Sequence, residues 1–373
     1  MRLSNILNLG LKELRSLARD RIMLVLIIYS FTAAVYTAAS AIPETLNKAS
    51  IGIVDEDGSA LSTRLISVFY PPYFNAPKMI TSAQMDAGMD DGSITFALDI
   101  PPNFQRDLLA KRTPEVQLNV DATRVSQAFT GAGYIQTIVA TEVAAFLQRY
   151  RATTVLPVDL ALRARFNTTL NKSWFGAIIE VINQVTLLSI ILTGAALIRE
   201  REHGTIEHLL VMPVTPFEIM ASKILAMALV VVVACAAALT LVVQGLLRVP
   251  IEGSVTLFLA GAAVNLFATT SLGIVLATVA RSMPQFALLT ILVIVPLEML
   301  SGGMTPRESM PQIVQDIMLA APTTHFIMLA QSVLFRGADF GVVWPQFVAL
   351  GTIGTMLFSL ALLRFRKAIA EVR

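Results

Sequence analysis

The sequence predicts an α-helical membrane protein, with a six-helix transmembrane bundle and a mixed α/β domain inserted between the first and second spans. Hydrophobic residues make up 55% of the 373 residues and charged residues only 14%, whereas a soluble domain carries about 25% charged residues. Six uncharged runs are long enough, or nearly so, for the roughly 20 residues that a spanning helix needs. Residues 43–173 have mixed composition and the size of one compact domain.

Residues 1–21 predict an amphipathic helix that lies along the inner membrane surface, and 22–42 predict the first span. The apolar positions that recur at helical spacing are Leu3, Ile6, Leu7, Leu11, Leu14, Leu17 and Ala18. Residues 39–41 resemble a signal-peptidase site, but a leader containing Glu13 and Asp20 is unusual. We therefore expect an uncleaved first span.

Residues 43–173 predict the α/β domain. Short runs bounded by Asp, Gly or Pro predict strands at 49–54, 94–100 and 116–120, and apolar spacing predicts helices at 59–69, 103–110 and 127–150. The single cysteine, Cys235, falls within a predicted span, so a disulfide in this domain is not expected.

Residues 174–363 contain the other five predicted spans, at 181–198, 224–247, 255–280, 283–297 and 342–363. Between the last two, apolar stretches within 301–340 are too short to cross and are interrupted by Pro311 and Pro322. They predict re-entrant or interfacial helices at the outer side, and 364–373 form a tail.

Lysine and arginine in the short connecting segments predict the orientation, because they concentrate on the cytoplasmic side. One side would carry Arg2, Lys12, Arg15, Arg19, Arg21, Arg199, Arg201, Lys223, Arg281, Arg364, Arg366, Lys367 and Arg373. The opposite short loops carry only Arg248, Arg307 and Arg336. Both termini and the hairpin at 199–223 are therefore expected in the cytoplasm and the α/β domain outside.

The hairpin at 199–223 is the most informative segment. Gly204 can end the long helix and Thr205 can cap the next, with Glu207 in its positive first turn. The apolar residues of this short helix share one face and are Ile206, Leu209 and Leu210; Pro213 and Pro216 follow. A two-turn helix is unstable alone in water, so this face must pack either on a partner or back onto its own bundle.

The pattern Glu200-x-Glu202-x-Gly204-Thr205-x-Glu207-x-Leu209-Leu210-x-x-Pro213 resembles the hallmark of type 2 ABC exporter permeases. The resemblance covers almost the whole chain and is also carried by residues 53–57, 100–104, 119–123 and 301–311. It implies a bacterial inner-membrane half-permease that pairs with a second copy or a close paralogue. It also implies that the outer domain is periplasmic and meets a membrane-fusion adaptor.

The same resemblance implies that the hairpin is a coupling helix that binds a separate ABC ATPase subunit. The residues placed at this interface are Arg199, Glu200, Arg201, Glu202, Gly204, Thr205, Ile206, Glu207, Leu209, Leu210, Pro213 and Pro216. The residues placed at the outer gate are Ser301, Gly302, Gly303, Pro306 and Pro311.

The chain is not expected to be an enzyme. It contains no Gly-Lys pair and hence no phosphate-binding loop, so ATP and Mg are expected on the partner ATPase and no cofactor on this chain. Glu200-x-x-His203 imitates a metal-ligand pair, but a single copy lacks the partners that such sites use, so neither a metal nor a catalytic site is predicted. A net charge of +2 without a basic face excludes nucleic acid as a partner.

Glu180 and Glu298 lie in or beside predicted spans, toward the outer ends. Each either reaches the interface or lines a cavity, and the sequence favours neither. The function predicted is ATP-driven export of a hydrophobic or amphipathic compound, either drug-like or a lipid. Two alternatives are an ion-coupled secondary transporter, which would need ionisable groups near the membrane centre, and a receptor or scaffold without transport.

Overall fold

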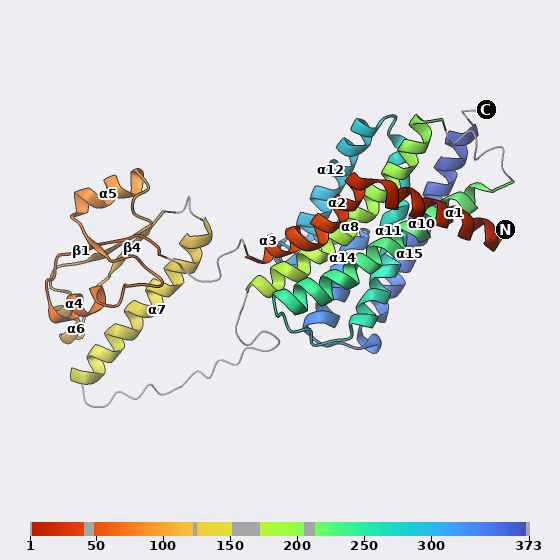
Figure 1. Cartoon of the computed structure of the whole chain (residues 1–373). Coiled ribbons are helices and arrows are strands. Elements are labelled where there is room, and N and C mark those ends of the chain that lie inside the picture. The colour runs from red at the N-terminus through yellow and green to blue at the C-terminus, as the bar shows by residue number, and fades with distance from the viewer. Residues whose placement is uncertain (1, 41–47, 122–124, 151–171, 205–212, 371–373) are drawn as a thin grey trace. The chain divides into compact units, whose positions relative to one another are not determined.

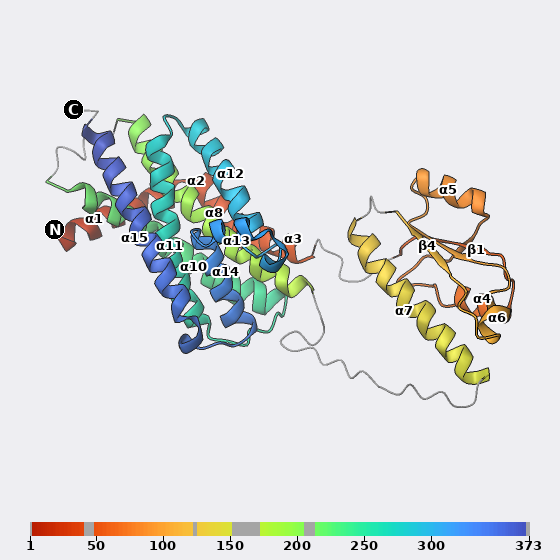
Figure 2. The ribbon, with the colours of Figure 1, turned by 180° about the vertical axis from the view of Figure 1, so that it is seen from behind.

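The computed structural model describes residues 2–40, 48–121, 125–150, 172–204 and 213–370. The chain divides into two compact units, one made of Met1–Ile42 with Arg163–Arg373 and the other of Pro43–Leu162. The first unit is a helical bundle, and the second combines a small sheet with helices (Figures 1 and 2).

The helical unit contains the predicted spans. Six helices among the described residues are long and apolar enough to cross a membrane, which confirms the prediction of six: Arg21–Ser40, Trp174–Glu202, Pro216–Leu246, Val255–Val279, Met283–Leu300 and Phe340–Lys367. The first is formed by α2 (Arg21–Tyr29), a π-helical turn η1 (Ser30–Ala34) and α3 (Val35–Ser40). The others are α8 (Lys172–Glu202), α10 (Pro216–Ala237) continued by η2 (Ala238–Leu246), α11 (Val255–Val279), α12 (Met283–Leu300) and α15 (Phe340–Ala370).

Helix α8 is the centre of the bundle. In its apolar stretch 78% is buried, compared with 17% for α12 and for α15. Helices α8 and α11 approach closely, because a Cβ atom on Gly273 would lie 2.7 Å from the carbonyl oxygen of Ile190. Small residues at such contacts let helix backbones pack tightly in a membrane. Helices α12 and α15 therefore keep large exposed apolar faces.

Between α12 and α15 the chain forms a 3-10 turn, η3 (Arg307–Ser309), and two short helices, α13 (Gln312–Met318) and α14 (Pro322–Ala330). Helix α14 continues into η4 (Gln331–Phe335). The chain bends by 91° between α13 and this combined segment, at the break between Met318 and Pro322. Proline lacks an N–H to continue a helix but fits a first helical position, so Pro322 both stops one helix and opens the next.

The second unit has a four-stranded sheet with the order β2-β1-β3-β4. Strand β1 (Ile51–Asp55) pairs in parallel with β2 (Lys78–Met79) and β3 (Phe96–Ile100), and β4 (Gln117–Val120) pairs antiparallel with β3. The helices are α4 (Ala60–Ile66), α5 (Ser82–Asp90), α6 (Phe104–Leu109) and α7 (Val125–Tyr150). Strands β1, β3 and β4 and helices α4, α6 and α7 fall within predicted segments or nearly so, whereas β2 and α5 were not predicted.

Candidate coupling site

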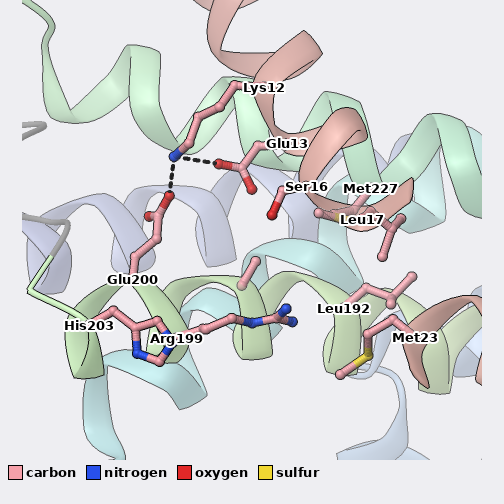
Figure 3. A pocket seen from close by; sticks show the side chains of 11 residues that line it. Lys12, Glu13, Ser16, Leu17, Met23, Leu192, Arg199, Glu200, His203 and Met227 are labelled. Carbon is pink, nitrogen blue, oxygen red and sulfur yellow. Dashed lines mark hydrogen bonds and ion pairs between the residues drawn. The ribbon is translucent and has the colours of Figure 1, made fainter. Parts of the chain in front are cut away.

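A cluster of four charged side chains joins three helices at one end of the bundle. Lys12 and Glu13 lie on α1 (Leu3–Arg19), Glu200 near the end of α8, and Lys223 on α10. The Lys223 Nζ lies 2.9 Å from Glu13 Oε1 and 2.8 Å from Glu200 Oε2. The Lys12 Nζ lies 2.6 Å from Glu200 Oε1 and 3.5 Å from Glu13 Oε1 (Figure 3). Opposite charges therefore alternate around the cluster, and its formal charge is zero.

Burial makes this pairing obligatory. Lys223 is 1% exposed and Glu13 is 6% exposed. A charge that is taken out of water without a partner is strongly destabilising, so each ion depends on the others. Burial lowers the pKa of Lys12, but the hydrogen bond to Glu200 and the charges of Glu200 and Glu13 outweigh it, so this pKa lies above its ordinary value.

Helix α1 supplies two of the four ions because Glu13 interrupts its buried face. That face consists of Ile6, Leu9, Glu13 and Leu17 and packs chiefly on α10. The helical spacing predicts one apolar side that joins Leu3, Leu7 and Leu11 to Ile6 and Leu17, but the first three are 71%, 63% and 46% exposed. The helix thus has a face that packs on the bundle and a second, exposed apolar face of the kind that suits a membrane surface.

The other charged residues at the end of α8 each hold a different element. Arg199 pairs with Asp20, whose carboxylate also accepts from the Met23 N–H and caps α2. Burial would raise the pKa of Asp20, but the hydrogen bonds from Met23 and Arg199 keep it below its ordinary value. Arg201 donates to the carbonyl oxygens of Ala277 and Ala280 at the end of α11. The fourth residue, Glu202, accepts from the Met283 N–H at the start of α12, at 2.9 Å.

The rest of the hairpin is described only in part. Gly204 follows α8 with φ +69°, a left-handed conformation that glycine adopts without cost. Thr205, Ile206, Glu207, Leu209 and Leu210 lie outside the described residues. Pro213 is exposed, and Pro216 occupies the first turn of α10, where Thr215 and Glu218 form a reciprocal capping box. Glu218 also accepts from the Arg2 N–H at 2.7 Å, which ties the start of α1 to the start of α10.

A cavity of about 250 Å³ lies beside the charge cluster, between α1 and α8. Its lining includes Ser16 and Leu17 from α1, Leu192 from α8, His203 from the turn after α8, and Met227 from α10 (Figure 3). Because α1 packs mainly on α10, its attachment to α8 depends on the Lys12–Glu200 pair more than on close packing.

At the other end of the bundle, the structure brings the residues predicted for an outer gate close to α14. The Ser301 hydroxyl hydrogen-bonds the Thr323 hydroxyl at 2.6 Å, and Gly302 has φ +97°. A Cβ on Gly303 would lie 3.2 Å from side-chain atoms of both Ile179 and Ile327, so this position joins α8 to α14. Pro306 lines a cavity there, and Pro311 precedes α13.

Comparison with known proteins identifies the family. The profile described as ABC-2 family transporter protein matches residues 22–363. The chain belongs to the ABC-2 transporter family. It is 60% identical over 370 residues to the inner membrane transport permease YhhJ of Escherichia coli K12, covering 99% of both proteins. The probable multidrug ABC transporter permeases YbhR and YbhS of the same organism are 26% and 24% identical, over 96% and 88% of this chain and 97% and 88% of their own lengths.

These findings confirm the resemblance seen in the sequence. The chain is an ABC-2 permease and a multi-pass protein of the inner membrane. As permeases, its relatives are transport proteins and not enzymes.

Two carboxylates singled out in the sequence lie near each other in this ABC-2 permease. Glu180 on α8 accepts a hydrogen bond of 2.6 Å from Gln184. Its carboxyl group interacts electrostatically with that of Glu298 on α12. Both side chains are partly buried. The fold therefore joins residues that are far apart in the sequence, and their role in the permease stays a prediction.

Sequence reasoning missed the partners of Glu200. In the sequence, Lys12 and Lys223 stand out only as positive charges expected on the cytoplasmic side. A usable signal was present, because Leu9, Glu13 and Leu17 follow one another at four-residue spacing. A carboxylate inside an apolar stripe requires a buried cation from another element.

Proposed function

We propose that this chain is the membrane-spanning subunit of an ABC exporter, which uses ATP hydrolysis in a separate subunit to move a hydrophobic or amphipathic compound outward. Membership of the ABC-2 family supports a permease, and two relatives are named as probable multidrug permeases. Drug-like molecules and lipids both fit this class of cargo. ATP and Mg would bind to the partner ATPase.

The charge cluster carries the proposal, because it offers a path from the hairpin to the bundle. The segment from His203 to Pro213 would contact the ATPase, with Glu207, Leu209 and Leu210 in the contact. Glu200, which is held inside the cluster, would transmit the displacement to α1 and α10 instead of touching the partner. Arg199, Arg201 and Glu202 would pass it to α2, α11 and α12. Nucleotide binding would then bias the bundle between two arrangements.

The proposed assembly follows the orientation predicted from lysine and arginine. Both termini and the hairpin would be cytoplasmic, and the α/β unit would be periplasmic, where a membrane-fusion adaptor could bind it. A second copy or a close paralogue would complete the transport path. The apolar faces that α12 and α15 leave exposed supply surface for this pairing as well as for lipid. The segment 301–311 would form part of the outer gate.

Copurification with the candidate ATPase, followed by an ATP hydrolysis assay in nanodiscs, tests the proposal. Glu207→Lys is expected to weaken binding of the ATPase and to remove cargo-stimulated hydrolysis. Glu115→Lys makes the same change on an exposed residue of the other unit and serves as the control. Unchanged binding and turnover with Glu207→Lys would refute the assigned contact.

A further inference from the structure

A second polar site lies in the cavity at the far end of the bundle. The cavity has a volume of about 590 Å³ and lies where the start of α8 meets residues 301–308 and α14 with η4. Phe175 in its lining is about 37 Å from Glu200 along α8, at the helical rise per residue. The cavity is therefore distinct from the coupling site, and on the proposed orientation it opens toward the periplasm.

The lining of this cavity includes hydrogen-bond donors that the described residues satisfy only in part. The Arg307 Nη2 donates to the Gln315 carbonyl oxygen at 3.1 Å, and Nη1 lies 3.7 Å from the Met328 sulfur, a weak acceptor. The Arg307 Nε is buried without a hydrogen-bond partner among the described residues. Leaving a charged donor unmet in this way is costly.

Further donors surround Arg307. Arg336 and Gln331 line the same cavity, and their side chains form no hydrogen bond within the described part of the chain. Among the described residues of the lining, the single acidic one is Glu308, which is exposed. The formal charge of the lining is thus positive, and arginine binds phosphate and carboxylate groups through paired N–H bonds.

Apolar side chains also belong to the lining. Phe175 stacks on Phe335 with ring centroids 4.2 Å apart, and Met304 and Ile327 also line the cavity. Phe175 is 43% exposed and Met304 is 68% exposed, so both can contact a ligand. A cavity that combines cationic donors with exposed aromatic and thioether groups is complementary to an amphiphile with an anionic head.

We propose that this cavity binds the phosphate or carboxylate head of an anionic amphiphile, with Arg307 and Arg336 holding the head and Phe175 and Met304 contacting the chain. This inference depends on the proposed function only in placing the site on the periplasmic side. It concerns binding, which does not require the ATPase, so its failure is distinguishable from failure of the export proposal.

The test uses the full chain in phosphatidylcholine nanodiscs, with dodecyl phosphate as the probe. The chain has two tryptophans, so Trp344→Phe leaves Trp174, the neighbour of Phe175, as the fluorescent reporter. We expect saturable binding of dodecyl phosphate and weaker binding of dodecylphosphocholine, which has the same chain but a neutral head. The double variant Arg307→Gln/Arg336→Gln should weaken binding by about tenfold or more, as expected when charged hydrogen bonds are lost.

Arg248→Gln is the matched control, because it removes a positive charge at the same end of the bundle from a residue outside the cavity lining. Arg336→Gln alone changes an exposed side chain and is informative even where the double variant fails to fold. Competition by inorganic phosphate would identify a free anion site, whereas competition by phosphatidylglycerol in the nanodisc would identify a lipid headgroup. Equal binding by the arginine variants, or equal binding of the two dodecyl compounds, would overturn the inference.

Discussion

Replacing Lys223 with methionine removes the most buried cation of the charge cluster while keeping an unbranched side chain. Its ammonium contacts Glu13 at 2.9 Å and Glu200 at 2.8 Å, so the variant leaves two carboxylates with Lys12 as their cation. Lys12 has a side chain that is 48% exposed and cannot fully replace the buried charge. Breaking a buried ion pair by removing one partner costs about 3–5 kcal/mol of stability.

This cost predicts a large fall in thermal stability. For a folded unit of roughly 150–250 residues, each kcal/mol shifts the melting temperature by about 2–4 °C, so the expected loss is about 6–20 °C. The apparent melting temperature is read by heating detergent-solubilised protein and following the monodisperse fraction by size-exclusion chromatography. Lys78→Met, on the exposed strand β2, is the control and should change stability by about 0.5 kcal/mol or less.

A double variant separates charge balance from side-chain packing. Glu13→Gln alone leaves an excess positive charge and should also destabilise, whereas Lys223→Met with Glu13→Gln restores neutrality between Lys12 and Glu200. The double variant should therefore recover most of the loss, with a coupling energy of about 2 kcal/mol or more. The reasoning fails if Lys223→Met melts within 2 °C of the wild type, about the precision of the assay, or if the double variant loses the sum of the two single losses.

Three further predictions follow from other contacts. The folded-state pKa of Asp20 lies below its ordinary value of 3.8. The stability that Asp20 supplies is therefore present above pH 3.8 and is lost as the pH falls through the folded-state pKa. Melting temperatures measured at falling pH should drop less for Asp20→Asn than for the wild type. Gly302→Ala places a side chain at φ +97° and should cost about 1–2 kcal/mol, whereas Gly351→Ala, inside α15 with open space around it, should be neutral or slightly stabilising in the same melting assay. If Glu298 lines the transport path, Glu298→Ala should lower export in vesicles without altering the melting temperature by more than a few degrees, and wild-type export by the folded variant would place the residue outside the path.

The spans could be predicted because a long uncharged run has few alternatives to crossing the bilayer. The uncharged run at 181–198 stops short of the end of α8, which continues through Arg199 to Glu202, where charged side chains find partners on other helices; Gly204 predicted where that helix ends. In the α/β unit, β1 and β3 could be predicted from short runs bounded by Asp, Gly or Pro, and both strands are largely buried. Strand β2 has two residues, both exposed, and leaves no periodic pattern to detect.

The candidate site was located from the hairpin motif but its composition was not. Periodicity along α1 reveals that the helix is amphipathic, yet it does not tell which apolar side meets protein and which remains exposed. Glu13 decides this, because its carboxylate must face Lys223, 210 residues further along the chain. Such a pairing depends on how α1, α8 and α10 meet, which local sequence does not record.

The position of Glu200 explains how a small movement of the hairpin could reach the whole bundle. Glu200 lies near the end of α8, one helical turn before Gly204. Residues 199–202 are consecutive, so their side chains point around the helix in different directions. Arg199 contacts the cap of α2, Glu200 contacts α1 and α10, Arg201 contacts the end of α11, and Glu202 contacts α12. A rotation of this last turn would therefore change several helix contacts at once. Because α8 is also the most enclosed span and begins beside the arginine-lined cavity, one helix connects the proposed coupling site to the proposed anion site.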